Sequence, residues 1–267
     1  MGIIVQAAGV QVSHGGNRIF TDLTFDLQDG DRAAIVGPNG SGKSTLFRLL
    51  TRDIAPERGA VTQRRGATIG FLTQEPALDP ATAVRDLLNQ ASGDPDQLER
   101  EIEALQDRLA EPLDDDEMSA VLDALTDGLA RLDDLLASDG AAEMDAVLDA
   151  LRVRRELLDR PFGTLSGGEK KIVALARFVI VKPDLLLLDE PENHLDADAK
   201  AWLETWLGSY KGAVGLISHD RYMIDRVANE IFEIEDGGIQ VYHGNYSQFQ
   251  EQKVARLTRA IELRELA

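Results

Sequence analysis

The sequence predicts an α/β fold with a mostly parallel core sheet, an N-terminal antiparallel β subdomain and an inserted helical subdomain. Three observations support this prediction. Apolar runs of strand length alternate with turns and helical patterns towards both ends of the chain. A glycine-rich segment, GPNGSGKST (37–45), directly follows one of these runs, and residues 95–137 have leucines at helical spacing. Such alternation of strands and helices is typical of a parallel sheet covered by helices.

Length and composition set the outer limits. The 267 residues suit one large domain with an insertion, or two small domains. The chain has no cysteine, which excludes disulfides, and its 43% of hydrophobic residues is enough for a sizeable core. It has no run of about eighteen apolar residues, and its first residues lack the pattern of a signal peptide. We therefore expect a cytoplasmic protein that does not enter a membrane.

The first quarter of the chain has the pattern of strands and turns. IIVQAAGVQV (3–12) and TDLTFDL (21–27) predict two antiparallel strands. A short apolar strand, RAAIVG (32–37), leads into the glycine-rich segment, and a helix is expected from about 43 to 51. Two more strands are expected in 57–63 and 66–74.

The middle of the chain predicts two amphipathic helices separated by EPLDDD (111–116). Their apolar residues step by three or four and form a narrow seam on each helix. The seam consists of Leu98, Ile102, Leu105 and Leu109, then Met118, Leu122, Leu125, Leu129 and Leu132. The pattern favours a helical hairpin that packs on itself, and an arm that contacts a partner is the alternative.

The net charge of −19 is concentrated in this insertion. Residues 93–160 contain 21 Asp and Glu against 7 Lys and Arg, a net charge of −14, and the remainder carries −5. Such acidity argues against broad electrostatic binding of nucleic acid, although the remainder has room for local basic patches.

The last third again alternates strands and helices. PDLLLLDE (183–190) and AVGLISH (213–219) are expected to be buried strands with a helix around 197–207 between them. EIFEIEDGGIQVYHG (230–244) predicts a hairpin with an Asp-Gly-Gly turn. A final helix is expected from 247 to the end.

The segment GPNGSGKST matches the phosphate-binding pattern G-x-x-x-x-G-K-[ST] between a strand and a helix. Its glycines let backbone N–H groups point at a polyanion. Lys43 is expected to reach the β- and γ-phosphates, and the Ser44 hydroxyl to bind Mg²⁺. The residues expected to contact a nucleotide are Asn39, Gly40, Ser41, Gly42, Lys43, Ser44 and Thr45. A glycine-rich turn without a chemical role is the alternative, which the strand and helix on either side disfavour.

The run LLLLDE supplies carboxylates that suit this loop. The carboxyl ends of parallel strands open at the ligand crevice. Asp189 is therefore expected near the metal, and Glu190 is expected to orient or deprotonate an attacking water. An acidic turn at the end of a strand is the alternative interpretation.

The phosphate loop, LSGGE (165–169), LLLLDEP and ISHD (217–220) together resemble the ATP-binding-cassette ATPases, in order and spacing over nearly the whole chain. The resemblance implies a P-loop ATPase core that binds ATP and Mg²⁺. It implies that Gln74 senses Mg²⁺ and the attacking water and that His219 contacts the γ-phosphate.

The same resemblance implies that two cassettes sandwich two nucleotides head to tail. The signature residues would bind the γ-phosphate of the ATP held by the opposite cassette, at the N-terminus of a helix. These residues are Ser166, Gly167, Gly168 and Glu169. Leu195 and Asp196, with the two residues before them, would form the loop that crosses to the other cassette.

Three positions depart from the family's pattern. His14 stands where a tyrosine usually stacks on adenine, and Phe20 is a second candidate for that role. Glu169 ends the signature where glutamine is common. Glu192, in DEPENHLD, stands where the family usually has threonine, and we expect it to tune closure of the cassette pair rather than the chemistry.

NHLD (193–196), SHDRYMID (218–225) and YHGNYSQFQEQK (242–253) resemble the ABC-F branch, soluble proteins with two cassettes on one chain. The resemblance implies a first cassette and the start of a linker, with the core in 1–92 and 164–246, a helical arm in 93–163 and the linker in 247–267. The implied partners are a second cassette, on the same full-length chain or in a homodimer, and the ribosome. Contacts with ribosomal RNA, ribosomal protein or tRNA would serve translation or antibiotic resistance.

Two other functions stay open from the sequence. One is the ATPase subunit of a membrane transporter, against which NHLD and GNYSQF argue. The other is a regulatory module that binds ATP with little turnover of its own, against which the intact Lys43, Asp189, Glu190 and His219 argue.

Overall fold

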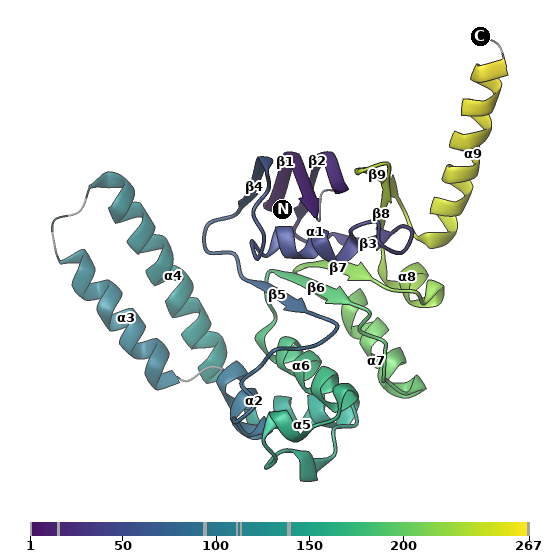
Figure 1. The fold of residues 1–267 in the computed structure, drawn as a ribbon. Helices are drawn as coiled ribbons and strands as arrows, with labels where there is room; N and C mark the ends of the chain where they lie inside the picture. The colour runs from purple at the N-terminus through teal and green to yellow at the C-terminus, as the bar shows by residue number, and fades with distance from the viewer. Residues whose placement is uncertain are drawn as a thin grey trace. The chain divides into compact units, whose positions relative to one another are not determined.

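The computed structural model describes residues 2–14, 17–92, 95–110, 112, 114–137 and 140–265. The chain divides into two compact units, 1–76 with 182–267 and 77–181. The first unit contains the sheets and the second is helical (Figure 1). The predicted α/β fold, with an antiparallel β part and an inserted helical part, is confirmed.

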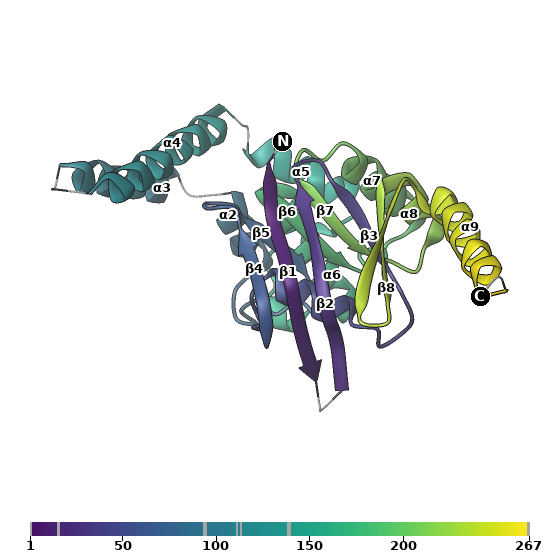
Figure 2. The same ribbon diagram turned by 90° about the horizontal axis from the view of Figure 1, so that it is seen from above.

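The first unit has two sheets (Figures 1 and 2). β1 (Ile3–His14), β2 (Asn17–Gln28) and β4 (Arg58–Gln63) form an antiparallel sheet in the order β2-β1-β4. The second sheet has the order β5-β6-β7-β3-β8-β9, and only its β8–β9 pair is antiparallel. Its strands are β3 (Arg32–Val36), β5 (Ile69–Leu72), β6 (Leu185–Asp189), β7 (Ala213–Ile217), β8 (Glu230–Glu235) and β9 (Gly238–His243).

The core of this unit explains why β6 is an unbroken apolar run. β6 lies between β5 and β7, and its four leucines, 185–188, have no exposed surface. A strand covered on both faces needs no polar alternation. Helix α1 (Lys43–Leu50) is anchored to the same core, because Phe47 meets Phe71 of β5 edge to face with ring centroids 5.6 Å apart. The packing therefore fixes the start of α1 relative to the end of β6.

Helices α7 (Ala197–Gly208), α8 (Arg221–Val227) and α9 (Tyr246–Glu265) complete the first unit. An aspartate caps each of the first two. Asp196 accepts from the backbone N–H of Ala199 at 2.9 Å, and Asp220 accepts from the N–H groups of Tyr222 and Met223 at 3.0 and 3.3 Å. Side-chain caps of this kind satisfy N–H groups that have no partner inside the helix.

The second unit contains α2 (Val84–Ser92), α3 (Pro95–Leu109), α4 (Asp115–Ala137), α5 (Gly140–Ala150) and α6 (Gly167–Val181). Two 3₁₀ turns, Arg155–Leu157 and Phe162–Thr164, lie between α5 and α6. α2 is a helix that the sequence analysis did not predict. It packs on α6 and buries Val84, Leu87 and Leu88.

The predicted hairpin is formed by α3 and α4, which run side by side (Figure 1). Ile102 is buried at their contact, where Gly128 leaves room for it. Three residues of the predicted apolar seam are exposed on α4: Met118, Leu122 and Leu129 are 37%, 47% and 44% exposed. Among the helices that the structure describes, none is long and apolar enough to cross a membrane.

Candidate functional site

The glycine-rich loop joins β3 to α1 with backbone angles that only glycine adopts easily. Gly40 and Gly42 have φ of 78° and 102°, in the left-handed region. A Cβ on Gly42 would lie 2.4 Å from Cγ2 of Ile19 and 3.0 Å from Cζ of Phe20. The loop therefore packs directly against β2, and its glycines leave the backbone free to approach a ligand.

Two polar side chains of the loop fit a phosphate group. The ammonium group of Lys43 donates to the carbonyl oxygens of Gly37 and Pro38 at 2.9 Å each. Burial lowers the pKa of Lys43, and the charges of Asp189 and Glu190 oppose this shift. Within the described part of the chain, the buried hydroxyl of Ser41 has no hydrogen-bond partner. A buried hydroxyl and a partly desolvated cation beside a glycine-rich turn suit the oxygens of a polyphosphate.

Ser44 and Asp189 form the part of the site that suits a metal. The Ser44 hydroxyl donates to Oδ2 of Asp189 at 2.8 Å, and Asp189 is only 7% exposed. A hydroxyl oxygen beside a carboxylate oxygen is a hard donor set of the kind that Mg²⁺ prefers. The chemistry of these two residues therefore fits a magnesium ion, and the metal-binding role that the sequence predicts for them stays a prediction.

Glu190 lies at the centre of a group of polar side chains. Its Oε2 accepts from Nδ2 of Asn193 at 2.7 Å and from Nε2 of Gln74 at 3.4 Å. Its Oε1 lies 3.2 Å from Nε2 of His219. The structure thus brings Gln74, Glu190 and His219 together, from three separate segments of the first unit.

The backbone of Glu190 is itself unusual. Its φ is 51°, a conformation that costs a residue other than glycine about 1–3 kcal/mol. The N–H group of Glu190 donates to the carbonyl oxygen of Ile217 at 2.8 Å, which extends the pairing of β6 with β7 by one residue. This strained turn directs the carboxylate towards His219, which follows β7.

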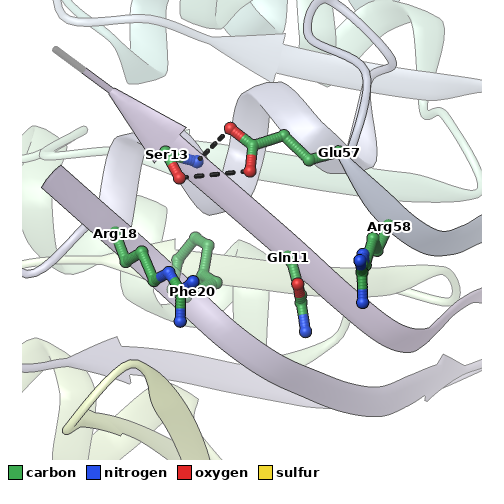
Figure 3. A pocket seen from close by; sticks show the side chains of 6 residues that line it. All are labelled: Gln11, Ser13, Arg18, Phe20, Glu57 and Arg58. Carbon is green, nitrogen blue, oxygen red and sulfur yellow. Dashed lines mark hydrogen bonds between the residues drawn. The ribbon is translucent and has the colours of Figure 1, made fainter. Parts of the chain in front are cut away.

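The residue that would stack on adenine stays a prediction. His14 ends β1, and its side chain lies outside the residues described. Phe20 has no exposed surface, so its ring is part of the core. Beside it lies a polar pocket of about 390 Å³ on β1, β2 and the start of β4 (Figure 3). The pocket is lined by Gln11, Ser13, Arg18, Phe20, Glu57 and Arg58, and it offers no exposed aromatic face.

The signature residues open α6, in the second unit. Oε2 of Glu169 accepts from the Ser166 N–H at 2.9 Å and from the Ser166 hydroxyl at 2.8 Å, and the Glu169 N–H points back at that hydroxyl at 3.4 Å. This reciprocal arrangement is a capping box. The two bonds from Ser166, together with the ion pair to Arg154, lower the pKa of Glu169 to about 2. The two donors of Ser166, which the resemblance assigns to a γ-phosphate, are therefore occupied by a carboxylate of the same chain.

Replacing Glu169 with glutamine is expected to reduce stability in a pH-dependent way. The folded pKa of about 2 lies below the usual 4.5, so the charged carboxylate stabilises the fold above pH 4.5. This contribution disappears as the pH falls towards 2. The free energy of unfolding in urea should be lower in Glu169→Gln by about 0.3–1 kcal/mol at pH 7, and the values of the two proteins should converge as the pH approaches 2. A difference that is constant from pH 7 to pH 3 would contradict the charged cap.

The remaining predicted residues lie after β6. Asp196 caps α7, and the N–H group of Leu195 donates to the carbonyl oxygen of Glu192 at 3.2 Å. The bond from Asn193 to Glu190 was not predicted, and neither was any role for Ser218, although both residues lie inside quoted motifs.

Residues 20–193 match the model of the ABC transporter family. The chain belongs to this family, and it is one ATP-binding cassette. It is 39% identical to the energy-dependent translational throttle protein EttA of Mycobacterium tuberculosis over 251 residues, 93% of this chain and 43% of that protein. It is 36% identical to EttA of Escherichia coli K12 over 243 residues, 90% of this chain and 42% of that protein. The chain thus spans less than half the length of the curated relatives that it matches.

The fold is similar to a solved ATP-binding subunit of an ABC transporter, with a TM-score of 0.66 and 18% identity over 93% of this chain and 92% of that one. At this identity the likeness concerns the fold alone. The predicted resemblance to an ATP-binding cassette of the ABC-F branch is confirmed by the family match and by the translational throttle relatives.

Proposed function

We propose that this cassette binds ATP with Mg²⁺, hydrolyses it, and acts in translation on the ribosome. The observation that carries the proposal is the convergence of one cation and two pairs of side chains in one unit. Lys43 lies on the phosphate loop, Ser44 bonds to Asp189, and Glu190 meets His219. A cation for phosphates, an oxygen pair for Mg²⁺ and a carboxylate beside an imidazole are what phosphoryl transfer to water requires.

In this proposal the groups divide nucleotide binding and hydrolysis between them. The loop N–H groups and Lys43 hold the β- and γ-phosphates, and Ser44 and Asp189, with Gln74, hold Mg²⁺. Glu190 accepts a proton from the attacking water, because it is the carboxylate one residue beyond the metal ligand. The bonds from Asn193 and Gln74 orient it. His219, whose Nε2 lies 3.2 Å from Oε1 of Glu190, would contact the γ-phosphate.

A second cassette completes the site in this proposal. The signature residues of one cassette would bind the γ-phosphate on the other, and the loop of Leu195 and Asp196 would cross between them. Glu169 would have to release the Ser166 hydroxyl when that phosphate binds. The second cassette belongs to the same full-length chain or to another copy, and a single cassette would hydrolyse ATP slowly.

The role in translation is supported by the names of the relatives, which are 36–39% identical translational throttle proteins. We propose this role alone, in the cytoplasm, and not one in antibiotic resistance. The arm of 93–163 would face basic ribosomal protein, because its acidity disfavours ribosomal RNA. In the linker helix α9, Lys253 pairs with Glu233 of β8 and Arg256 pairs with Glu235 of the same strand. The charges of these two basic residues are therefore already paired within the chain.

Sedimentation with ribosomes tests the proposal. The Glu190→Gln variant with ATP and Mg²⁺ should pellet with purified ribosomes, since it would hold the closed state. The same variant with ADP should stay in the supernatant, and so should a Glu190→Gln, Lys43→Met double variant with ATP. Pelleting that does not depend on the nucleotide, or no pelleting in any condition, would overturn the role on the ribosome.

A further inference from the structure

Glu192, the residue that departs from the family's pattern, is buried inside the first unit. It is only 8% exposed. Its Oε1 accepts from the Ser218 hydroxyl and from the backbone N–H of His219, the latter at 3.3 Å. Both donors belong to the turn that connects β7 to α8. The side chain therefore contacts the segment that carries His219, and it does not point out of the unit.

Ser218 extends this contact along the turn. Its hydroxyl donates to Glu192 and accepts from the Asp220 N–H at 2.9 Å. Asp220 caps α8 and pairs with Lys200 of α7 at 2.9 Å. The bond to Asp220 is the main cause that raises the pKa of Lys200, and the charge of Glu192 adds to it. The turn 218–220 is thus held at both ends, by Glu192 and by Lys200.

Stability alone does not account for this carboxylate. Among the residues that the structure describes, no group donates to its second oxygen, Oε2, although that oxygen is buried. An unsatisfied buried polar atom costs free energy, and the cost is larger when the atom is charged. A residue that carries such a cost next to the reacting groups is better explained by what it positions.

We propose that Glu192 is a positioning residue for hydrolysis: it holds the turn 218–220 so that the imidazole of His219 faces Glu190. The proposal rests on the proposed ATPase function. It replaces the expectation that Glu192 tunes closure, because both hydrogen bonds to its carboxylate come from the turn that carries His219. Threonine, the usual family residue, is two atoms shorter and would not span the same gap to Ser218.

The first test measures the turn without ATP. Glu192→Ala leaves the Ser218 hydroxyl and the His219 N–H without their acceptor, whereas Glu192→Gln keeps a carbonyl oxygen there. Hydrogen exchange of the His219 and Asp220 amides should become about 10-fold faster in Glu192→Ala and stay within about twofold in Glu192→Gln. Unchanged exchange in Glu192→Ala would overturn the proposal.

The second test asks whether Glu192 acts through His219. Glu192→Ala should lower kcat about 10-fold with little change in the affinity for ATP, and Glu192→Gln should restore most of the rate. The double variant Glu192→Ala, His219→Ala should be no slower than His219→Ala alone, because the positioned group is already gone. If the two substitutions instead lower kcat independently, so that the double variant is slower than His219→Ala alone, the proposal is overturned.

Glu204 provides the matched control. It is also a buried glutamate, 9% exposed, and it pairs with Arg226 at 3.2 Å. Glu204→Ala should leave the exchange at His219 and kcat unchanged, whatever its effect on stability. If the wild-type cassette shows no turnover, alone or paired, the proposed hydrolysis fails, and the exchange measurement still decides whether Glu192 holds the turn.

Discussion

Replacing Glu190 with glutamine is expected to lower the rate of ATP hydrolysis by about 10²–10⁴-fold while the affinity for ATP stays nearly the same. Glutamine has the same length, and its carbonyl oxygen can keep the 2.7 Å bond from Asn193. It cannot accept a proton from water at neutral pH. Single-turnover hydrolysis and binding of a fluorescent nucleotide would measure the two quantities separately.

The same variant should collect as an ATP-bound dimer of cassettes, visible by gel filtration, because closure would no longer be followed by hydrolysis. Glu235→Gln is the matched control, since Glu235 is exposed on β8 and its carboxylate accepts from Arg256 of α9. That variant should hydrolyse ATP at the wild-type rate. A Glu190→Gln cassette that hydrolyses ATP equally fast would exclude Glu190 as the base.

The sequence was most informative where the geometry is local. The phosphate loop is nine consecutive residues between a strand and a helix, so its glycines and Lys43 were identified from their spacing. The run of leucines in β6 predicted a strand buried on both faces, and all four are buried. Helix α2 was missed because its buried residues, Val84, Leu87 and Leu88, fill barely more than one helical turn.

Contacts between neighbouring strands were harder to predict. Glu192 meets Ser218 across 26 positions of sequence because β6 pairs with β7 in parallel, which places the two following turns side by side. The approach of His219 to Glu190 has the same origin. Family resemblance indicated that His219 matters, but its contact with Glu190 and the support of the turn by Glu192 depend on strand order.

Replacing Lys43 with methionine is expected to weaken ATP binding by about 100-fold, because the variant loses charge-assisted bonds to the phosphates worth about 1.5–3 kcal/mol each. Nucleotide titration with Mg²⁺ would measure the loss. Methionine keeps the apolar stem of the side chain in place, so the loop should keep its packing against β2.

The Lys43→Met substitution should hardly change the free energy of unfolding, because it has two effects of opposite sign. Burial lowers the pKa of Lys43, which means that the folded state disfavours the charged form that the unfolded chain carries at neutral pH. Methionine removes this cost, and it also removes the two bonds to the carbonyl oxygens of Gly37 and Pro38. The opposing effects should leave the free energy of unfolding within about 1 kcal/mol of wild type. A large loss of stability that parallels the loss of binding would mean that Lys43 holds the empty loop together, and that the weaker binding reports a collapsed loop instead of a missing phosphate contact.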